Sequence, residues 1–279
     1  MGKKKQRPLP QELNLPAGGA DSHVHLDMGH LSHTLDQVLA RAGSCGVSTL
    51  GHVFLGPESY RRGEKNFSGY DQVFFILGVH PHDARNFSRD DASDIIEHAG
   101  KDKKIRAVGE IGLDFFYEHS LPQEQIQAFR TQLDSARQMS MPVVIHSRDA
   151  YPETVSILMD MGLKDYPVLW HCFGQGPEQA REIISLGWHI SIPGSVTYKK
   201  NTMLREAVKT IDPDRLLLET DCPFLAPEPY RGKENEPALL GFTALQVAQI
   251  KNMRAEELWI QCGANCRRFF NIADTLPWH

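Results

Sequence analysis

The sequence lacks three features: long apolar runs, an excess of positive charge, and a large number of cysteines. No stretch approaches the roughly 18 uninterrupted apolar residues of a transmembrane helix, so no membrane span is predicted. The formal net charge is −5, whereas a protein that holds long duplex DNA through its phosphates is normally basic. Any contact with nucleic acid is therefore expected to be confined to one local site.

The cysteines are few and scattered along the chain. Five cysteines in 279 residues, an odd number, argue against a disulfide framework and favour a reducing, cytoplasmic location. They are Cys45, Cys172, Cys222, Cys262 and Cys266.

Short segments rich in β-branched and aromatic residues alternate with helical patterns along the whole chain. Their apolar runs are continuous, as expected for strands that are buried on both faces of a parallel sheet. The eight predicted strands are Ala20–His25, Val47–Phe54, Val73–His80, Ile105–Ile111, Val143–His146, Val168–His171, Trp188–Ile192 and Leu216–Asp221.

Helical patterns fill the gaps between these strands. The clearest is Pro122–Met139, where Ile126, Phe129 and Leu133 recur three or four residues apart and form one apolar stripe. The other predicted helices are His33–Ala42, Ala92–Ala99, Pro152–Met161, Pro177–Leu186, Asn201–Ile211, Pro237–Lys251 and Ala255–Phe270.

Eight strands alternating with eight helices predict an α/β fold, a single (β/α)8 TIM-like barrel with a C-terminal helix. The alternative is an open doubly wound sheet. It is disfavoured because no Gly-x-Gly-x-x-Gly turn follows the first strand, and because polar residues gather at the ends of many strands. Residues 18–279 are assigned to the barrel, and residues 1–17 to a flexible basic tail.

Histidines and carboxylates stand at the carboxyl ends of five predicted strands. In a barrel these ends surround one mouth, where buried polar groups need a shared partner such as a divalent metal ion. His23 and His25 are two residues apart and would share one face of the first strand. The candidate ligands are His23, His25, Glu110, His146, His171 and Asp221.

Four imidazoles and two carboxylates exceed the needs of one tetrahedral ion with an open position, but they suit two divalent ions. Glu110 is expected to bridge the two ions. The first ion is assigned to His23, His25 and Asp221, and the second to His146 and His171. Zinc suits an imidazole-rich site best, with magnesium or manganese as alternatives.

The stretches that carry these residues resemble the TatD-type family of metal-dependent hydrolases, within the amidohydrolase-like barrels. They span nearly the whole chain in the family's order, and the family's metal positions fall on the six candidate ligands. The segment Gly51–Asn66 and the residues before Asp21 depart from the family pattern. The matching stretches are Asp21–Asp27, Gly78–Pro81, Gly109–Asp114, His146–Asp149, His171–Phe173, Glu219–Pro227, Pro229–Lys233 and Asn235–Pro237.

The resemblance implies a cytoplasmic deoxyribonuclease, often an exonuclease, that hydrolyses phosphodiesters with divalent metals. The expected substrate is DNA, as single strands or 3′ ends cleaved in the 3′–5′ direction, with no membrane and no obligate protein partner. A water activated by two metals would attack phosphorus, with Glu110 and Asp221 as catalytic residues and Asp221 as the base. Four residues are predicted to bind the substrate phosphate: His80, Arg148, Arg231 and Lys233.

Two cysteines adjoin candidate ligands. Neighbouring residues on a strand point to opposite faces, so Cys172 and Cys222 are predicted to pack in the barrel wall. No cysteine or serine nucleophile is required by the expected mechanism.

Two other functions stay open at this point. An amidohydrolase-type enzyme could use the same ligands to cleave a small-molecule amide, lactone or phosphoester, although a bridging lysine in place of Glu110 would have favoured that class more. A metal-binding protein without catalytic activity is disfavoured by the complete set of six ligands. A panel of substrates assayed with added metal would distinguish the three.

Overall fold

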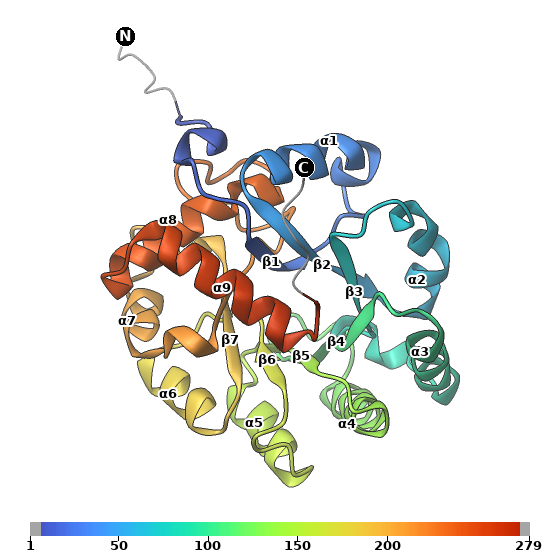
Figure 1. Cartoon of the computed structure of the whole chain (residues 1–279). Coiled ribbons are helices and arrows are strands. Elements are labelled where there is room, and N and C mark those ends of the chain that lie inside the picture. Colours follow the sequence, from blue (N-terminus) through green and yellow to red (C-terminus); the bar gives the residue numbers. More distant parts are fainter. Residues whose placement is uncertain (1–6, 274–279) are drawn as a thin grey trace.

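The computed structural model describes residues 7–273 as one barrel surrounded by helices (Figure 1). Its single sheet has eight parallel strands in sequence order: β1 (Gly19–Val24), β2 (Val47–Leu55), β3 (Val73–Gly78), β4 (Ile105–Asp114), β5 (Val143–Arg148), β6 (Val168–Trp170), β7 (His189–Ile192) and β8 (Leu216–Leu218). Val24 forms a parallel bridge with Cys222, just after β8, and so joins the two ends of the sheet. The predicted barrel is confirmed.

The described residues contain nine α-helices: α1 (Leu35–Ser44), α2 (Pro57–Gly63), α3 (Arg89–Lys101), α4 (Pro122–Met139), α5 (Tyr151–Asp160), α6 (Pro177–Ser185), α7 (Thr202–Thr210), α8 (Leu240–Lys251) and α9 (Ala255–Phe269). The prediction of eight helices missed α2. This helix has only seven residues and two of them are arginines, so it has no apolar stripe to reveal it.

The strands are buried on both faces, which explains their continuous apolar runs. Consecutive residues enter different cores: Ile76 and Val144 pack inside the barrel, whereas Phe75 and Ile145 belong to the larger core shared with the surrounding helices. Alternation along each strand therefore fills both cores with apolar side chains.

Helix α9 crosses one end of the barrel (Figure 1). Its Cys266 and Phe269 are part of the inner core, and the indole N–H of Trp259 donates to the carbonyl of Pro16 at 2.8 Å. A Cβ atom on Gly19 would lie 1.8 Å from the Trp259 ring, so only glycine allows β1 to approach this helix so closely. The last helix thus seals the end of the barrel where the strands begin.

Several predicted strands end earlier than expected. β3 ends at Gly78, β6 at Trp170 and β8 at Leu218, so the polar residues that follow lie in loops at the barrel mouth. In a strand, successive side chains point to opposite faces, but in these loops side chains from successive residues can face the same site.

The N-terminal segment differs in part from the predicted flexible tail. Residues 1–6 lie outside the described part of the chain. From residue 7 onward the segment contacts the barrel: Arg7 Nε donates to the carbonyl of Pro229, and the Tyr230 hydroxyl donates to the carbonyl of Pro8. A short 3-10 helix follows at Pro10–Leu13.

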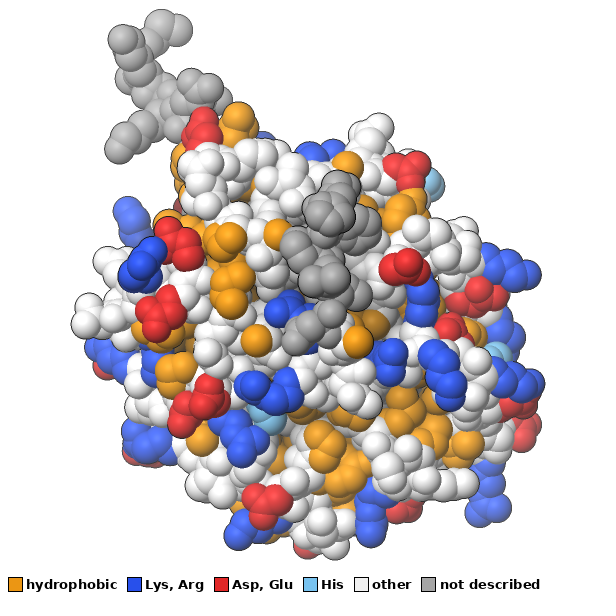
Figure 2. All heavy atoms as spheres, viewed as in Figure 1, with side chains coloured by type: hydrophobic (Ala, Val, Ile, Leu, Met, Phe, Trp, Pro, Cys, Tyr) orange, Lys and Arg blue, Asp and Glu red, His pale blue; other side chains and the backbone are white. Residues whose placement is uncertain are grey.

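Figure 2 shows acidic and basic side chains interspersed on the face crossed by α9. This mixture agrees with the modest net charge of −5. Among the described residues, no helix is long and apolar enough to cross a membrane.

Candidate metal centre

Glu110, in the middle of β4, is buried at the barrel mouth. Its Oε1 lies 2.7 Å from both His146 Nδ1 and His171 Nε2, and 3.4 Å from His80 Nε2. Its other oxygen, Oε2, lies 3.2 Å from His23 Nε2. The two oxygens of one carboxylate thus face different groups of imidazoles, which is the arrangement that a bridging ligand requires.

Asp221 follows β8 and faces β1 across the closure of the barrel. Its Oδ1 lies 3.5 Å from His25 Nε2 and 4.0 Å from His23 Nε2. The N–H of Asp221 donates to the carbonyl of His23 at 3.1 Å, and the N–H of His25 donates to the carbonyl of Cys222 at 2.9 Å. These backbone bonds fix the register between the ligands that come from the two ends of the sheet.

The six predicted ligands lie together and, with His80, form three overlapping sets, within each of which the donor atoms are all within 4.8 Å of one another. The sets are His23, His25 and Asp221; His23, Glu110 and His171; and His80, Glu110 and His146. The first set is the one predicted for the first ion. The structure places His146 and His171 in separate sets, whereas both were expected on the second ion, and it adds His80.

The donor set fits divalent metal ions. His23 Nε2 is buried and has no hydrogen-bond partner among residues 7–273. Glu110 Oε2 lies 3.2 Å away without forming a hydrogen bond, and an ion shared with His25 and Asp221 would satisfy this buried nitrogen. Imidazole and carboxylate donors in this mixture suit zinc and accept other divalent ions.

The carboxylates of the centre are held in their charged form. Burial opposes ionisation of Glu110, but the imidazoles of His171 and His80 outweigh it and hold the pKa of Glu110 well below its usual range. Burial likewise opposes ionisation of Asp221, and the hydrogen bond from His25 outweighs it and lowers the pKa of Asp221. Both carboxylates are therefore ready to bind cations at neutral pH.

The negative charge of the carboxylates favours the protonated form of the neighbouring imidazoles when no metal is bound. Burial opposes protonation of His171, but the carboxylate of Glu110 overcomes it and raises the pKa of His171 well above its usual value. For His146, hydrogen bonds to Asp114 and Glu110 outweigh burial and also raise its pKa. Protons and metal ions therefore compete for these ring nitrogens.

Metal binding is expected to release protons and to weaken as the pH falls. In the metal-free protein, the raised pKa of His171 keeps its ring protonated above pH 6.5, the ordinary imidazole value. A metal ion must therefore displace this proton even above pH 6.5, and protons compete more strongly as the pH falls. Calorimetric titration with zinc at about pH 7, in two buffers of different ionisation enthalpy, should show release of about one proton or more per chain. A binding heat that does not depend on the buffer would contradict His171 as a ligand.

Two buried carboxylates that the sequence did not identify lie behind the ligands. Asp114 Oδ2 is 3.1 Å from His146 Nε2, on the opposite side of the ring from Glu110. Glu219 Oε2 is 3.6 Å from His171 Nδ1. Carboxylates in this position orient an imidazole and decide which of its nitrogens can bind a metal.

Two further polar residues fix the backbone beneath the first set of ligands. The N–H of Leu26 donates to Nδ1 of His52 on β2 at 3.2 Å, and burial lowers the pKa of His52 to about 3, which keeps its ring neutral. Asp21 accepts hydrogen bonds from the N–H and the hydroxyl of Thr220, at 2.9 and 2.6 Å. Burial raises the pKa of Asp21 to about 8.

Cys172 lies in the site, and its predicted place in the barrel wall is wrong. β6 ends at Trp170, and the positive φ of 46° at Cys172 turns its side chain toward the mouth. Its Sγ donates to Asp221 Oδ2 at 3.9 Å. Burial, reinforced by Asp221, raises the pKa of the thiol well above its usual value, so it is not a thiolate nucleophile. Cys222 is fully buried, as expected.

Two of the residues predicted to contact substrate adjoin the centre. His80 is buried against Glu110 and belongs to the third ligand set, so its imidazole could also hold a metal ion; its predicted contact with the phosphate stays a prediction. Arg148, at the end of β5, is exposed at the mouth, with its guanidinium carbon 4.2 Å from the ring centroid of Phe116.

The other two lie in the loop after β8. Arg231 stacks on the ring of Tyr198 at 4.3 Å, and Lys233 is exposed two residues further on. Within residues 7–273, neither side chain forms a hydrogen bond or an ion pair with the ligand cluster. Their predicted contact with substrate stays a prediction.

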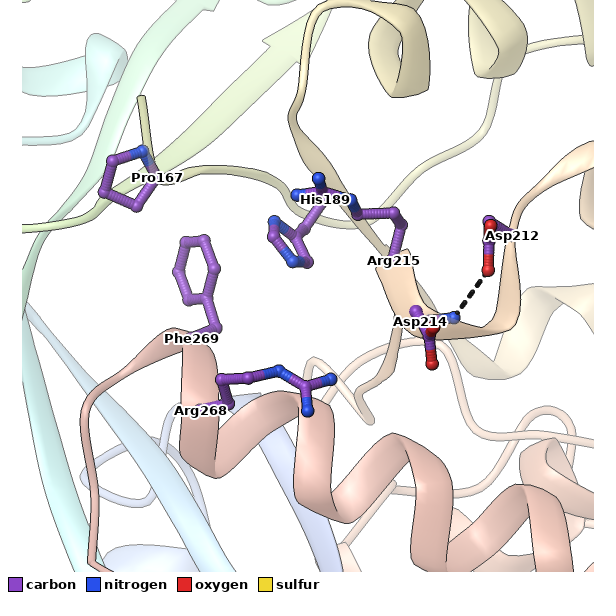
Figure 3. Close-up of a pocket in the computed structure, with 7 residues that line it drawn as sticks. All are labelled: Pro167, His189, Asp212, Asp214, Arg215, Arg268 and Phe269. Atoms are coloured by element: carbon purple, nitrogen blue, oxygen red, sulfur yellow. Dashed lines mark hydrogen bonds between the residues drawn. The ribbon is translucent and has the colours of Figure 1, made fainter. Parts of the chain in front are cut away.

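A separate pocket opens at the other end of the barrel, where β6, β7 and β8 begin (Figure 3). Its cavity volume is about 620 Å³, and it is lined by Pro167, His189, Asp212, Asp214, Arg215, Arg268 and Phe269. Two of its polar side chains serve the fold: Arg215 donates to the carbonyl of Gly187, and the Asp212 carboxylate accepts from the N–H of Asp214. Catalytic residues of such barrels gather at the opposite end, around the carboxyl ends of the strands.

The sequence model of one family, described as TatD related DNase, matches residues 20–271 of the chain. The chain belongs to the TatD family. The match covers every strand from β1 to β8 and helix α9, and it therefore includes all residues of the metal centre.

Individual members of the TatD family are similar over nearly their whole length. The uncharacterized metal-dependent hydrolase YabD of Bacillus subtilis is 36% identical over 252 residues, which cover 90% of this chain and 98% of YabD. A protein of Klebsiella pneumoniae named 3′-5′ ssDNA/RNA exonuclease TatD is 35% identical over 260 residues, 90% of this chain and 97% of its own length.

A solved TatD structure has the same fold. The crystal structure of YJJV, a TatD homolog from Escherichia coli, superimposes with a TM-score of 0.86 at 25% sequence identity, covering 92% of this chain and 99% of YJJV. The predicted family resemblance and the predicted enzyme class, a metal-dependent hydrolase, are confirmed.

Proposed function

We propose that this TatD protein is a two-metal phosphodiesterase that removes nucleotides from single-stranded DNA or from DNA ends, in the 3′–5′ direction. The observation that carries the proposal is the position of Glu110, whose two oxygens face separate groups of imidazoles at the mouth of the barrel. Zinc is our first choice of ion, with magnesium and manganese as alternatives.

The chain would hold the two ions between its two sets of imidazoles. His23, His25 and Asp221 would hold the first ion and Glu110 would be shared. His146 and His171 would hold the second ion, with His80 beside them. When bound, the ions would polarise a phosphoryl oxygen and supply a nucleophilic water at neutral pH.

Asp221 is our choice for the general base. Its side chain is 14% exposed, more than that of Glu110 at 5%, so one of its oxygens can reach a water at the mouth. Its lowered pKa keeps it ionised at neutral pH and able to accept a proton. His80 and Arg148 would contact the phosphate that is being cleaved.

The choice of nucleic acid rests on charge and on one relative. The Klebsiella protein is named an exonuclease of single-stranded DNA and RNA. Arg148 at the end of β5, and Arg231 and Lys233 in the loop after β8, are three exposed cations, whereas the whole chain has a net charge of −5. A few cations beside a metal centre suit a flexible strand or a chain end better than a long rigid duplex.

We also propose that the protein acts in the cytoplasm. All five cysteines are free thiols, and four of them are buried: Cys45, Cys222, Cys262 and Cys266. Free thiols in these numbers are typical of a reducing compartment.

Single-stranded DNA is the expected substrate in a direct assay. Metal-free protein given zinc, magnesium or manganese should shorten a single-stranded oligonucleotide from its 3′ end, at a rate at least about tenfold higher than for a blunt duplex. Labels at the 5′ and the 3′ end identify the direction of cleavage, and EDTA should stop the reaction. Activity only on small amides, lactones or phosphoesters would support the amidohydrolase-type alternative instead.

A further inference from the structure

Exposed aromatic side chains gather at the barrel mouth. Among the described residues, the exposed large hydrophobic side chains include three aromatic ones: Phe116 (54% exposed), Tyr117 (52%) and Phe224 (52%). Phe116 and Tyr117 follow β4, and Phe224 follows β8, so all three lie where the strands end. Large apolar side chains exposed together beside a site are typical of a surface that binds a ligand.

The pair Phe116 and Tyr117 is fixed to the metal centre by Asp114. One oxygen of Asp114 accepts the N–H of Phe116 at 3.0 Å and the N–H of Tyr117 at 2.9 Å. Its other oxygen lies 3.1 Å from Nε2 of the candidate ligand His146. The Asp114 carboxylate therefore contacts both the candidate ligand His146 and the backbone of the loop that carries the two aromatic rings.

The rings of the pair are also braced by a cation. The Arg148 guanidinium carbon lies 4.2 Å from the ring centroid of Phe116 and 5.2 Å from that of Tyr117. The two rings meet edge to face, with their centroids 4.8 Å apart. This contact leaves more than half of each aromatic side chain exposed and places a positive charge beside them.

The aromatic side chains stand at the two ends of a row of imidazoles that crosses the centre. Consecutive ring centroids along the row are between 3.9 and 6.4 Å apart. The row runs Phe224, His25, His23, His171, His146, His82 and Tyr117. A polynucleotide whose phosphate lies over the candidate ligands thus has an exposed aromatic ring on either side.

We propose that Phe116 and Tyr117, braced by Arg148, form a platform on which an unpaired base next to the cleaved phosphate stacks, with Phe224 serving the base on the other side. This inference rests on the proposed nuclease function and names the part of the substrate that the site recognises. Base stacking on aromatic rings tolerates every base, and an adjacent cation neutralises the backbone. Bases inside a duplex are already stacked on their neighbours, so the platform selects single strands and frayed ends.

Binding of two matched oligonucleotides to zinc-loaded protein tests the platform. Both are phosphorothioates of about ten units, which resist hydrolysis; one carries thymine bases and the other has abasic tetrahydrofuran sugars with the same phosphates. The double variant Phe116→Ala/Tyr117→Ala should raise the Kd of the thymine strand at least about tenfold and leave the Kd of the abasic strand unchanged. Arg148→Ala should raise both Kd values, because it removes a charge next to the phosphates.

Two controls distinguish a failure of the platform proposal from misfolding of a variant and from a failure of the proposed nuclease function. Met159→Ala removes an exposed apolar side chain on α5, outside the mouth, and should change neither Kd; thermal unfolding shows whether each variant is folded. Equal Kd values for the thymine strand in wild type and a folded double variant would overturn the platform. Hydrolysis of an unmodified strand by the wild type is measured in parallel: its absence overturns the proposed nuclease function, whatever the binding shows.

Discussion

Replacing Glu110 with glutamine is expected to abolish hydrolysis and to remove at least one bound metal ion per chain. The amide keeps the size of the side chain but loses the charge that faces His23 on one side and His146 and His171 on the other. Loss of one preorganised charged group commonly costs an active site about 10²–10³ in rate, and a ligand shared by two ions should cost at least about 10³.

Metal content and rate are measured on the same preparation of the Glu110→Gln variant. Glu257→Gln is the matched control, since Glu257 is exposed in the first turn of α9, at the opposite end of the barrel, and should keep both properties. Full activity with an unchanged number of ions in the Glu110 variant would refute the role of Glu110 as a shared ligand.

Replacing Asp221 with asparagine is expected to lower kcat by about 10²–10⁴ while part of the metal stays bound. The amide oxygen can still face His25 and His23, but it no longer accepts a proton from water. The other candidate ligands, which come from β1 and the residue after it, β4, β5 and the loop after β6, are unchanged in this variant.

Titration with metal separates the two possible roles of Asp221. If Asp221 acts only as a ligand, excess zinc should restore the activity of Asp221→Asn to within a few-fold of the wild type. If it is also the general base, the loss of kcat should persist at saturating zinc.

Much of the fold and the ligand set follows from local sequence. Strands buried on both faces give continuous apolar runs, and these runs located all eight strands because each strand of the barrel lies between an inner and an outer core. Polar residues at the ends of such runs are conspicuous, and His23, Glu110 and Asp221 were visible for that reason.

Contacts between separate loops were not visible in the sequence. Asp114 supports His146 from β4, and Glu219 supports His171 from beyond β8, and no spacing within one segment encodes either pair. Cys172 was misplaced because strand alternation was extended past the end of β6, where the backbone turns at a positive φ. The contacts of Arg7 and Pro8 with the loop after β8 were not visible because a short segment without apolar periodicity shows no pattern of burial.

The most direct test of the account is the rate of single-strand cleavage as a function of the number of ions bound per chain. Metal-free protein is titrated with zinc, the bound ions are counted by elemental analysis, and the release of nucleotides from an unmodified oligonucleotide is followed at each step. We predict negligible cleavage up to one ion per chain and a steep rise between one and two. Full cleavage with one ion, or cleavage that survives EDTA, would contradict a centre built around two ions that share Glu110.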